Sequence, residues 1–431
     1  MMRTACGVLG LALALASPAL AGDGLRAGAA RVDITPPTGY PMWGYGARQD
    51  APCRGVLDAL RARALVLAVG EQRIALVSLD LGRAPTRRST AAIRDRVKKD
   101  AGVEHIFLVA SHTHHGPVLE MDSWPDAKKP YVGQLEQKIS DVIVEAARGL
   151  KPARLGLASR EVSLNRNRHS RRADAPVDRE LLVLRVEDED GKPIATAVNF
   201  AAHPTMRDVR VFKFSADYPG VMADLVEKES GGPCLFLQGA AGDLSTNAGT
   251  EGGPDRFGRA LGRQVLTLAK TIRCTAVAEP TLAVREDDFR FKSRTDLDKP
   301  GIKAALGLAF LPALVDFYQK EYRTGVRPHL TTALLDGRIG LVGVSGEFFC
   351  GHSLSLKRRA RLDHVLFLGY CNDYQQYFPT IEAASEGGYG AEPPVSNAEV
   401  GAGERMIDRA LIHLYKMRGK LPNLPLDKPD K

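Results

Sequence analysis

Three of the ten histidines of this 431-residue chain fall within four residues, in the run Ser111-His112-Thr113-His114-His115-Gly116-Pro117. The apolar segment 106–110 before the run indicates a buried strand, and Gly116-Pro117 after it favours a turn. Open α/β folds place their ligand sites at such strand ends. Because neutral imidazole binds zinc and titrates near neutral pH, the run could hold a metal or carry a proton, or it could simply form a solvated turn.

The spacing within the run separates the three imidazoles. In extended backbone, His112 and His114 lie two residues apart and share a face, whereas His115 points elsewhere. One histidine could therefore bind a metal while another moves a proton.

Two further strand ends carry candidate ligands. His203 follows the strand predicted over 194–200, where a structural, hydrogen-bonded histidine is the alternative. Glu347 follows the apolar strand predicted over 339–344. A carboxylate in that setting needs a partner, and a metal ion is one, because burying an unpaired charge is costly.

Two other segments contain residues that could take part in chemistry. The glycine-rich turn 238–247 could present Ser245 as a nucleophile, or it could be a tight turn capped by Asp243. It lacks the glycine spacing of a nucleophile elbow and the lysine of a P-loop. A tyrosine cluster, Tyr370, Tyr374, Tyr377 and Tyr389, is typical of packing with an accessible hydroxyl.

The elements that must position these residues alternate between strands and helices. Strands are predicted over 64–69, 73–79, 106–110, 181–186, 194–200, 234–237, 331–335 and 339–344, and helices over 90–100, 133–148, 256–272, 302–322 and 397–415. This alternation favours an α/β fold with mixed β-sheets layered with α-helices. We expect a single large domain over residues 22–418, followed by a loose tail over 419–431.

The N-terminus has the features of a secretory signal peptide. A basic start, an apolar stretch and the small residues Ala19-Leu20-Ala21 predict cleavage after Ala21, which would place the protein outside the cell or in the periplasm. Five cysteines follow, widely spaced and without a CxxC pattern, so we expect buried thiols with one or two disulfides as the alternative.

Composition narrows the function classes. The chain is 44% hydrophobic and 26% charged, which is typical of a soluble globular protein, and no later segment is long enough to span a membrane. Its net charge of +8 is scattered and is not interleaved with aromatic residues, so we expect no nucleic-acid partner.

The order of motifs resembles the catalytic N-terminal domain of the neutral/alkaline non-lysosomal ceramidases, without their C-terminal immunoglobulin-like domain. The resemblance rests on separated motifs that follow one another in the family's order: Val32-Asp33-Ile34-Thr35-Pro36, Gly44-Tyr45, Ser111-His112-Thr113-His114, Asn165-Arg166-Asn167-Arg168, Asn199-Phe200-Ala201-Ala202-His203, Gly242-Asp243-Leu244-Ser245, Gly346-Glu347-Phe348 and Asn372-Asp373-Tyr374-Gln375-Gln376-Tyr377.

This resemblance implies a zinc-dependent amidohydrolase. By the family's pattern, one zinc ion is held by four side chains, which are His112, His203, Glu347 and Tyr377, with Tyr374 as the competing tyrosine. The resemblance further implies that His114 transfers protons and that Arg168, with Arg166 as the alternative, and Tyr389 stabilise the oxyanion. Ser245 matches a serine of uncertain role. A second, structural Ca²⁺ or Mg²⁺ ion is conceivable, with Asp33 and Asp80 as candidate ligands.

The resemblance also implies a substrate class, and two other functions remain as alternative hypotheses. It implies cleavage of an N-acyl amide bond in a small or lipid-like molecule, with peripheral membrane contact as an option. Departures from the family, such as His115 in place of a serine, suggest a substrate other than ceramide. The rival hypotheses are a metal-independent serine hydrolase that uses Ser245 and a secreted binding protein without catalysis.

Overall fold

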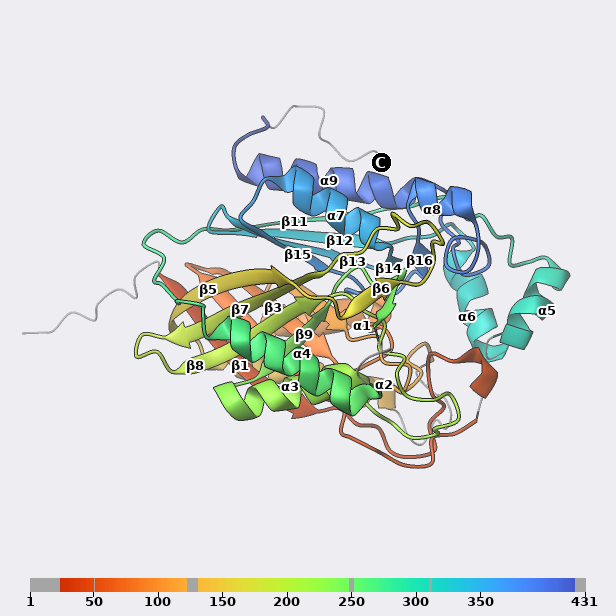
Figure 1. Ribbon diagram of the computed structural model, residues 1–431, viewed down its shortest axis with the longest axis horizontal. Coiled ribbons are helices and arrows are strands. Elements are labelled where there is room, and N and C mark those ends of the chain that lie inside the picture. Colours follow the sequence, from red (N-terminus) through yellow and green to blue (C-terminus); the bar gives the residue numbers. More distant parts are fainter. Residues whose placement is uncertain (1–23, 50, 122–130, 248–251, 310–311, 423–431) are drawn as a thin grey trace, which may run out of the picture.

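Two β-sheets packed face to face form the centre of the protein, and helices cover both outer faces (Figure 1). The computed structural model describes residues 24–49, 51–121, 131–247, 252–309 and 312–422. The signal peptide predicted over 1–21 and most of the tail predicted over 419–431 lie outside these residues. The predicted fold class, mixed sheets layered with helices, is confirmed.

The larger sheet has eight strands in the order β4-β3-β2-β1-β5-β7-β8-β9. Their bounds are β1 Leu25–Asp33, β2 Arg61–Val69, β3 Gln72–Leu79, β4 His105–Ala110, β5 Lys151–Glu161, β7 Glu180–Asp188, β8 Pro193–Phe200 and β9 Cys234–Gln238. The pairs at the two edges, β3 with β4 and β8 with β9, are parallel. Each is joined by a crossover helix, α1 (Arg87–Ala101) and α3 (Asp217–Ser230), as parallel pairing requires.

The smaller sheet has the order β11-β12-β13-β15, with β11 Leu282–Asp288, β12 His329–Leu335, β13 Ile339–Val344 and β15 His364–Leu368. Helices α7 (Cys350–Ala360) and α9 (Ala402–Met417) cover it, while α2 (Tyr131–Arg148), α3 and α4 (Pro254–Ala269) lie against the larger sheet (Figure 1). Two short pairs complete the strands: β6 (Asn165–Asn167) with β10 (Leu244–Thr246), and β14 (Glu347–Phe348) with β16 (Tyr377–Phe378).

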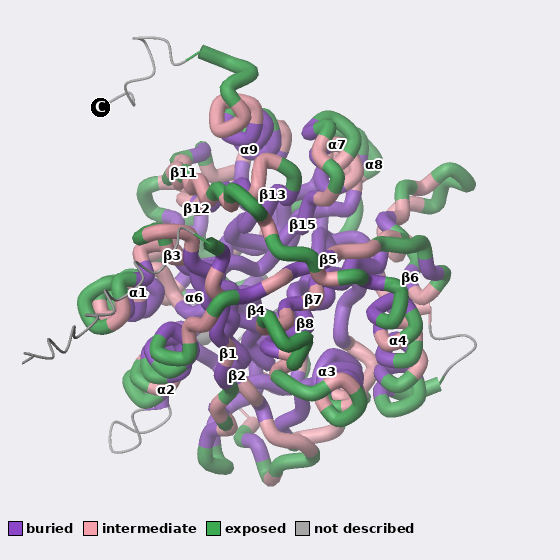
Figure 2. The backbone as a smooth tube through the Cα atoms, turned by 90° about the vertical axis from the view of Figure 1, so that its left-hand side faces the viewer, coloured by how far each residue is buried: buried purple, intermediate pink, exposed green. Residues whose placement is uncertain are grey.

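Aliphatic side chains from both sheets fill the space between them, and the backbone there is largely buried (Figure 2). Leu67 and Phe107 of the larger sheet belong to the same cluster as Leu341 and Leu366 of the smaller one. Each such side chain contributes about 1.5–3 kcal/mol by leaving water. This double-sided core is a rigid support for loops at the strand ends.

One helix that we predicted as continuous is interrupted in the structure. The segment 302–322 forms two helices, α5 (Pro300–Ala309) and α6 (Pro312–Tyr322), rather than one. Pro312 has no amide hydrogen for an interior helical hydrogen bond but fits the first position of a new helix. Helix α9 also begins later than the predicted residue 397, and a short helix, α8 (Ile381–Glu386), precedes it.

The five cysteines of the described residues are all unbridged, and four of them are buried, as expected for buried thiols. Among the helices that the structure describes, none combines the length and apolar character that crossing a bilayer demands.

Candidate metal centre

The two candidate histidine ligands follow strands that lie near opposite edges of the larger sheet. His112 follows the edge strand β4, and His203 follows β8, next to the other edge strand β9. Strand β9 nevertheless contacts β4, because the sheet curves until its edges approach each other. Gln238, the last residue of β9, closes this junction: its buried side-chain amide donates to Ser111 O at 3.0 Å and to Ala202 O at 2.9 Å.

Backbone carbonyls orient both imidazoles. The Nδ1 atom of His112 lies 2.7 Å from Gly82 O, and that of His203 lies 2.6 Å from Ala241 O. Since a carbonyl can only accept, each Nδ1 carries the proton and each Nε2 presents a lone pair. This arrangement is typical of histidines that bind a metal through Nε2.

Glu347 completes a convergent set of donor atoms. Its Oε2 atom lies 3.3 Å from His112 Nε2 and 3.1 Å from His203 Nε2. Ligand atoms held about 2.0–2.1 Å from a zinc ion in tetrahedral geometry are about 3.3 Å apart, so the separations fit that ion. The ring nitrogens of His112, His114 and His203 also lie within 4.8 Å of one another, and this buried group could hold a metal.

Hydroxyl groups fix the Glu347 carboxylate. Tyr374 donates to Oε1, the oxygen turned away from the histidines, and Tyr370 donates to Oε2 at 3.3 Å. Although burial opposes the charged form, the imidazoles of His112 and His203 hold the pKa of Glu347 well below its usual range. The site therefore presents a carboxylate rather than a neutral acid at neutral pH.

His203 and His114 are neutral under the same conditions. Burial, followed by the charge of Arg168, lowers the pKa of His203 to about 3, and burial with the neighbouring His112 lowers the pKa of His114 well below its ordinary value. Neutral imidazoles keep the lone pairs that a metal or a transferred proton requires.

His114 lies beside the ligand set on the cavity side. Its Nε2 is 3.3 Å from His112 Nε2, and its ring packs edge-on against Trp43 and Tyr45. Gly44 makes this contact possible, because a Cβ atom there would lie 2.6 Å from the His114 ring, and the φ of Gly44, +106°, also favours glycine. His112 and His114 thus lie side by side, although the extended backbone expected for the run is absent at His112, whose φ is +70°.

Arg168 lies at the site and Arg166 does not. Arg168 Nη2 donates to His203 Nε2 at 2.9 Å, to Gly242 O at 3.0 Å and to Tyr377 Oη at 3.0 Å. Arg166 is exposed on β6, where it pairs with Ser245 in the neighbouring strand. The structure thus brings together His203, Arg168 and Tyr377, three residues that the sequence analysis placed in one site.

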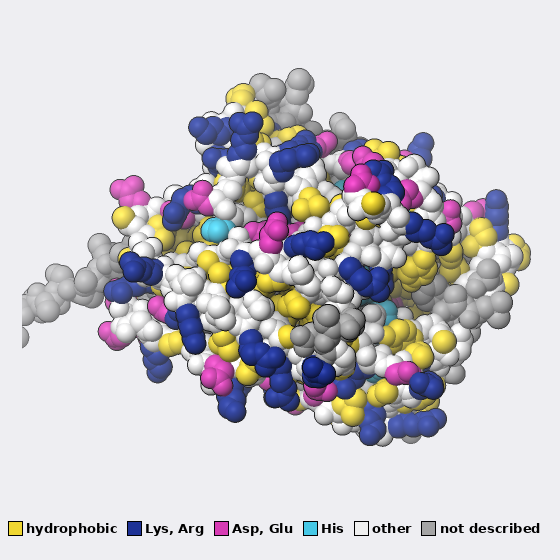
Figure 3. Space-filling view, viewed as in Figure 1, with side chains coloured by type: hydrophobic (Ala, Val, Ile, Leu, Met, Phe, Trp, Pro, Cys, Tyr) yellow, Lys and Arg dark blue, Asp and Glu magenta, His cyan; other side chains and the backbone are white. Residues whose placement is uncertain are grey.

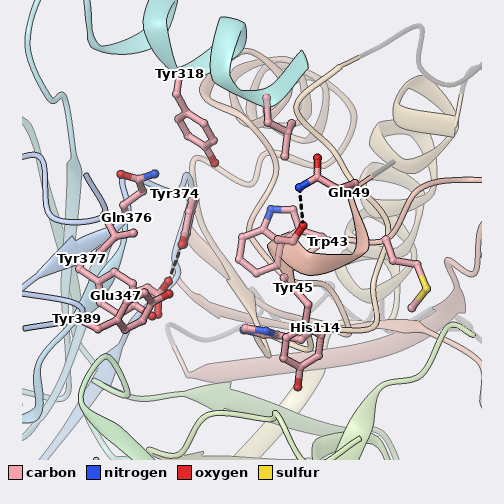
Figure 4. Close-up of a pocket in the computed structure, with 15 residues that line it drawn as sticks. Trp43, Tyr45, Gln49, His114, Tyr318, Glu347, Tyr374, Gln376, Tyr377 and Tyr389 are labelled. Carbon is pink, nitrogen blue, oxygen red and sulfur yellow. Dashed lines mark hydrogen bonds between the residues drawn. The ribbon is translucent and has the colours of Figure 1, made fainter. Parts of the chain in front are cut away.

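A cavity borders this site at Glu347, Tyr377 and His114 (Figure 4). Glu347, Tyr374, Tyr377 and Tyr389 lie on one side of it, and His114 lies on the facing side with Trp43 and Tyr45. The ring of Tyr389 is largely exposed and packs edge-on against Tyr377 at 5.6 Å. Further apolar lining comes from Met42, Leu314, Tyr318 and Val395.

Ser245 occupies a different position from these residues. It lies on β10, beside His203 in a backbone bridge, and it is absent from the lining of the cavity. Among the described residues, no histidine forms a hydrogen bond with its hydroxyl. Asp243 accepts from the amide of Cys350, so it ties the glycine-rich turn to α7.

Sequence reasoning missed a buried network beneath the cavity. Glu120 Oε1 accepts from Trp43 Nε1 at 3.0 Å, from Tyr318 Oη at 3.0 Å and from Arg83 Nη1 at 3.2 Å. Arg83 also pairs with Asp373 at 3.0 Å. The network joins two cavity walls that are far apart in sequence. Only Asp373 lay in a noted motif, and no local pattern marks the rest.

His115, the third histidine of the run, points away from the ligand set as predicted. Its Nε2 accepts from Arg48 Nη2 at 2.6 Å, and burial followed by the Arg48 charge lowers the pKa of His115 to about 3. Its role is structural: it attaches the segment that carries Tyr45 to the histidine run. Asp80, a candidate for a second metal, is paired with the buried Arg63 at 2.9 Å, and that second ion stays a prediction.

Comparisons with known proteins place the chain in a family and a fold. A family model for neutral/alkaline non-lysosomal ceramidase, N-terminal, matches residues 25–254. Neutral ceramidase B of Dictyostelium discoideum is 29% identical over 171 residues, which are 33% of this chain and 24% of that protein, so the match spans about a quarter of the relative's length.

Solved structures extend the likeness to most of the chain. Neutral ceramidase from Pseudomonas aeruginosa superposes with a TM-score of 0.74 at 21% identity and covers 94% of this chain and 76% of that one. A structure described as ceramidase complexed with C2 gives a TM-score of 0.74 at 20% identity, with coverages of 95% and 78%. Both likenesses show a shared fold.

Proposed function

Because the chain belongs to the neutral/alkaline non-lysosomal ceramidase family, as its motif order indicated, we propose that it is a zinc-dependent hydrolase of N-acyl amide bonds. The observation that carries this proposal is that His112 Nε2 and His203 Nε2 lie 3.3 Å and 3.1 Å from Glu347 Oε2, with both imidazoles oriented by backbone carbonyls. Its substrate has a ceramide-like N-acyl group but need not be ceramide.

The proposed zinc ligands are His112, His203, Glu347 and Tyr377. Tyr377 is favoured over Tyr374 because Tyr374 already donates to the outer oxygen of Glu347, whereas Tyr377 lies on the His203 side, bonded to the same Arg168 nitrogen. Zinc, when bound, supplies a Lewis acid and lowers the pKa of water toward neutrality.

His114 is the proposed proton carrier. It lines the cavity, it is neutral, and its Nδ1 is a buried atom without a hydrogen-bond partner in the described residues. It can therefore accept a proton from the attacking water and return it to the departing amine nitrogen. Direct coordination by His114 is the competing role, since its ring nitrogen belongs to the group that could hold a metal.

Arg168 and the tyrosines are the proposed stabilisers of negative charge on the carbonyl oxygen. Although burial opposes its charge, the hydroxyl of Tyr377 and the Glu347 carboxylate hold the pKa of Arg168 above its usual value. A fixed guanidinium and a hydroxyl at Tyr389 favour an oxyanion more strongly than a neutral carbonyl. The aromatic cavity around Trp43 and Tyr318 suits the apolar acyl chain.

Removal of the metal tests the proposal. Protein treated with a chelator should lose hydrolysis of N-acyl lipids and N-acyl sugars, and zinc should restore it. His114→Ala should retain zinc and lose most turnover. Full activity in metal-free protein would contradict the zinc proposal and favour the Ser245 mechanism, which Ser245→Ala would then test.

Export completes the proposed function. We propose that residues 1–21 are removed and that the protein acts outside the cytoplasm, on the grounds of the signal-peptide pattern. N-terminal sequencing of the mature protein should give Gly22 as the first residue.

A further inference from the structure

A second cavity adjoins the aromatic one and has the opposite chemistry. Tyr389 lines both cavities, so they are neighbours at this residue. The second cavity is lined by Arg168, His169, Arg171, Gly242, Glu386, Gly387, Gly388 and Tyr389. It contains two arginines and no aliphatic side chain among the described residues, whereas the first cavity contains Met42, Leu314 and Val395.

The Arg168 guanidinium has N–H groups at the second cavity that are available to a ligand. All the hydrogen bonds of the Arg168 side chain, to His203, Gly242 and Tyr377, use the single nitrogen Nη2. Within the described part of the chain, Nη1 and Nε have no hydrogen-bond partner, and neither is among the buried unpaired atoms. They are therefore reachable from the second cavity, and a guanidinium with free nitrogens is suited to a planar, two-oxygen anion.

Arg171 adds a second positive charge to the same cavity. Its side chain is exposed, and no ion pair neutralises it among the residues of known position. Among the described residues, Glu386 at the end of α8 is the one acidic residue of the lining, so the arginines there outnumber the carboxylates. Lysine and arginine side chains are also frequent on the molecular face seen in Figure 3.

A hydrogen bond holds the two sides of this cavity together. His169 Nδ1 lies 3.2 Å from Tyr389 O, which ties the arginine-bearing loop to the turn at 387–390. Gly387 and Gly388 have φ values of +70° and +86°, a left-handed conformation that favours glycine in this turn. The cavity is thus built by paired segments rather than by isolated surface arginines.

We infer that the second cavity binds an acidic group on the amine portion of the substrate, and that the preferred substrates are N-acyl compounds whose amine portion bears a carboxylate, sulfonate or phosphate. This inference rests on the proposed hydrolase function. The acyl chain occupies the aromatic cavity, and the anion pairs with Arg168 and Arg171. In the reaction, water adds its hydroxyl to the carbonyl carbon and a proton to the nitrogen as the C–N bond breaks, which releases a fatty acid and an acidic amine.

Matched amides with one acyl chain test the inference on the zinc-loaded protein. N-dodecanoylglycine and N-dodecanoyltaurine should be cleaved with a kcat/KM at least about tenfold above that of neutral N-dodecanoylethanolamine, since one charge-assisted bond is worth that much. Arg171→Gln should remove most of this preference, mainly through KM, and leave the neutral amide within about twofold of its original rate.

Arg172→Gln is the matched control. Arg172 lies in the same loop, but its guanidinium is paired with Asp174 and does not line the second cavity. This variant should keep the preference for acidic substrates. If Arg171→Gln and Arg172→Gln lost the preference for acidic substrates equally, the cause would be a general charge effect, and the specific site would be overturned.

Binding separates this inference from the function on which it rests. Dissociation constants for the same amides, measured by tryptophan fluorescence through Trp43, require no turnover. Equal affinity for acidic and neutral amides overturns the inference, even if all are hydrolysed. Tighter, Arg171-dependent binding of the acidic amides without hydrolysis supports the cavity and contradicts the proposed hydrolase.

Discussion

The imidazole rings of His112 and His203 lie 4.7 Å apart at an angle of 87°, although they follow strands on opposite sides of the larger sheet. Perpendicular rings of this kind can direct two Nε2 lone pairs at one point without stacking. The curvature of the sheet and the Gln238 side chain bring them together. The candidate metal centre therefore depends on backbone architecture as much as on its ligands.

Gln238 should act as a positioning residue. Gln238→Ala leaves Ser111 O without its donor, whereas Ala202 O keeps the Tyr218 hydroxyl, and a buried unpaired group costs about 1–3 kcal/mol. Urea denaturation should show that loss, and chelator competition should show weaker zinc binding. Gln319→Ala, which removes an amide bonded to Asp298 on the surface, is the control and should change neither. Unchanged zinc affinity in Gln238→Ala would contradict the role.

The two candidate tyrosine ligands should behave differently. Tyr374→Phe removes a donor to the outer Glu347 oxygen, so zinc should bind about 10–100-fold more weakly, with part of the activity retained. Tyr377→Phe should weaken zinc binding further and abolish turnover. Zinc affinities measured by chelator competition decide between the two tyrosines. A larger loss of zinc affinity in Tyr374→Phe than in Tyr377→Phe would assign Tyr374 as the ligand.

Glu120 should fix the walls of the aromatic cavity. Glu120→Ala deprives Trp43, Tyr318 and Arg83 of their shared acceptor, and breaking a buried ion pair costs about 3–5 kcal/mol. Trp43 emission should shift, and KM for N-acyl substrates should rise. Glu321→Ala, which removes a more exposed carboxylate paired with Arg87, should cost at most about 1 kcal/mol. Identical effects of the two variants would contradict this role.

The stability of the metal-free protein should fall in acid. His115 has a pKa near 3 when folded and about 6.5 when unfolded, so the unfolded chain binds the proton more tightly between these values. Its contribution is complete above pH 6.5 and is lost as the pH falls toward 3, by up to about 5 kcal/mol. His115→Gln should reduce this slope in urea titrations at pH 7.5, 6 and 5. An unchanged slope would show that other groups cause the acid sensitivity.

Local patterns were enough to predict the strand ends that carry His112, His203 and Glu347, because apolar runs and turn residues mark such ends. Local patterns did not predict the contacts between segments that are distant in the sequence. The Gln238 bridge and the Glu120 network depend on how the sheets curve and pack, which no short window encodes. The choice of Arg168 over Arg166 needed the pairing of β6 with β10, since strand register determines which side chain faces the site.

Zinc content is the most direct test of the central claim that His112, His203 and Glu347 form one metal site. The purified protein should hold about one zinc ion per chain by elemental analysis, as four-ligand sites of this kind do. His112→Ala and Glu347→Gln should fall well below that value, while His115→Gln, which alters a histidine outside the ligand set, should match the parent protein. Stoichiometric zinc in folded His112→Ala would contradict the assignment.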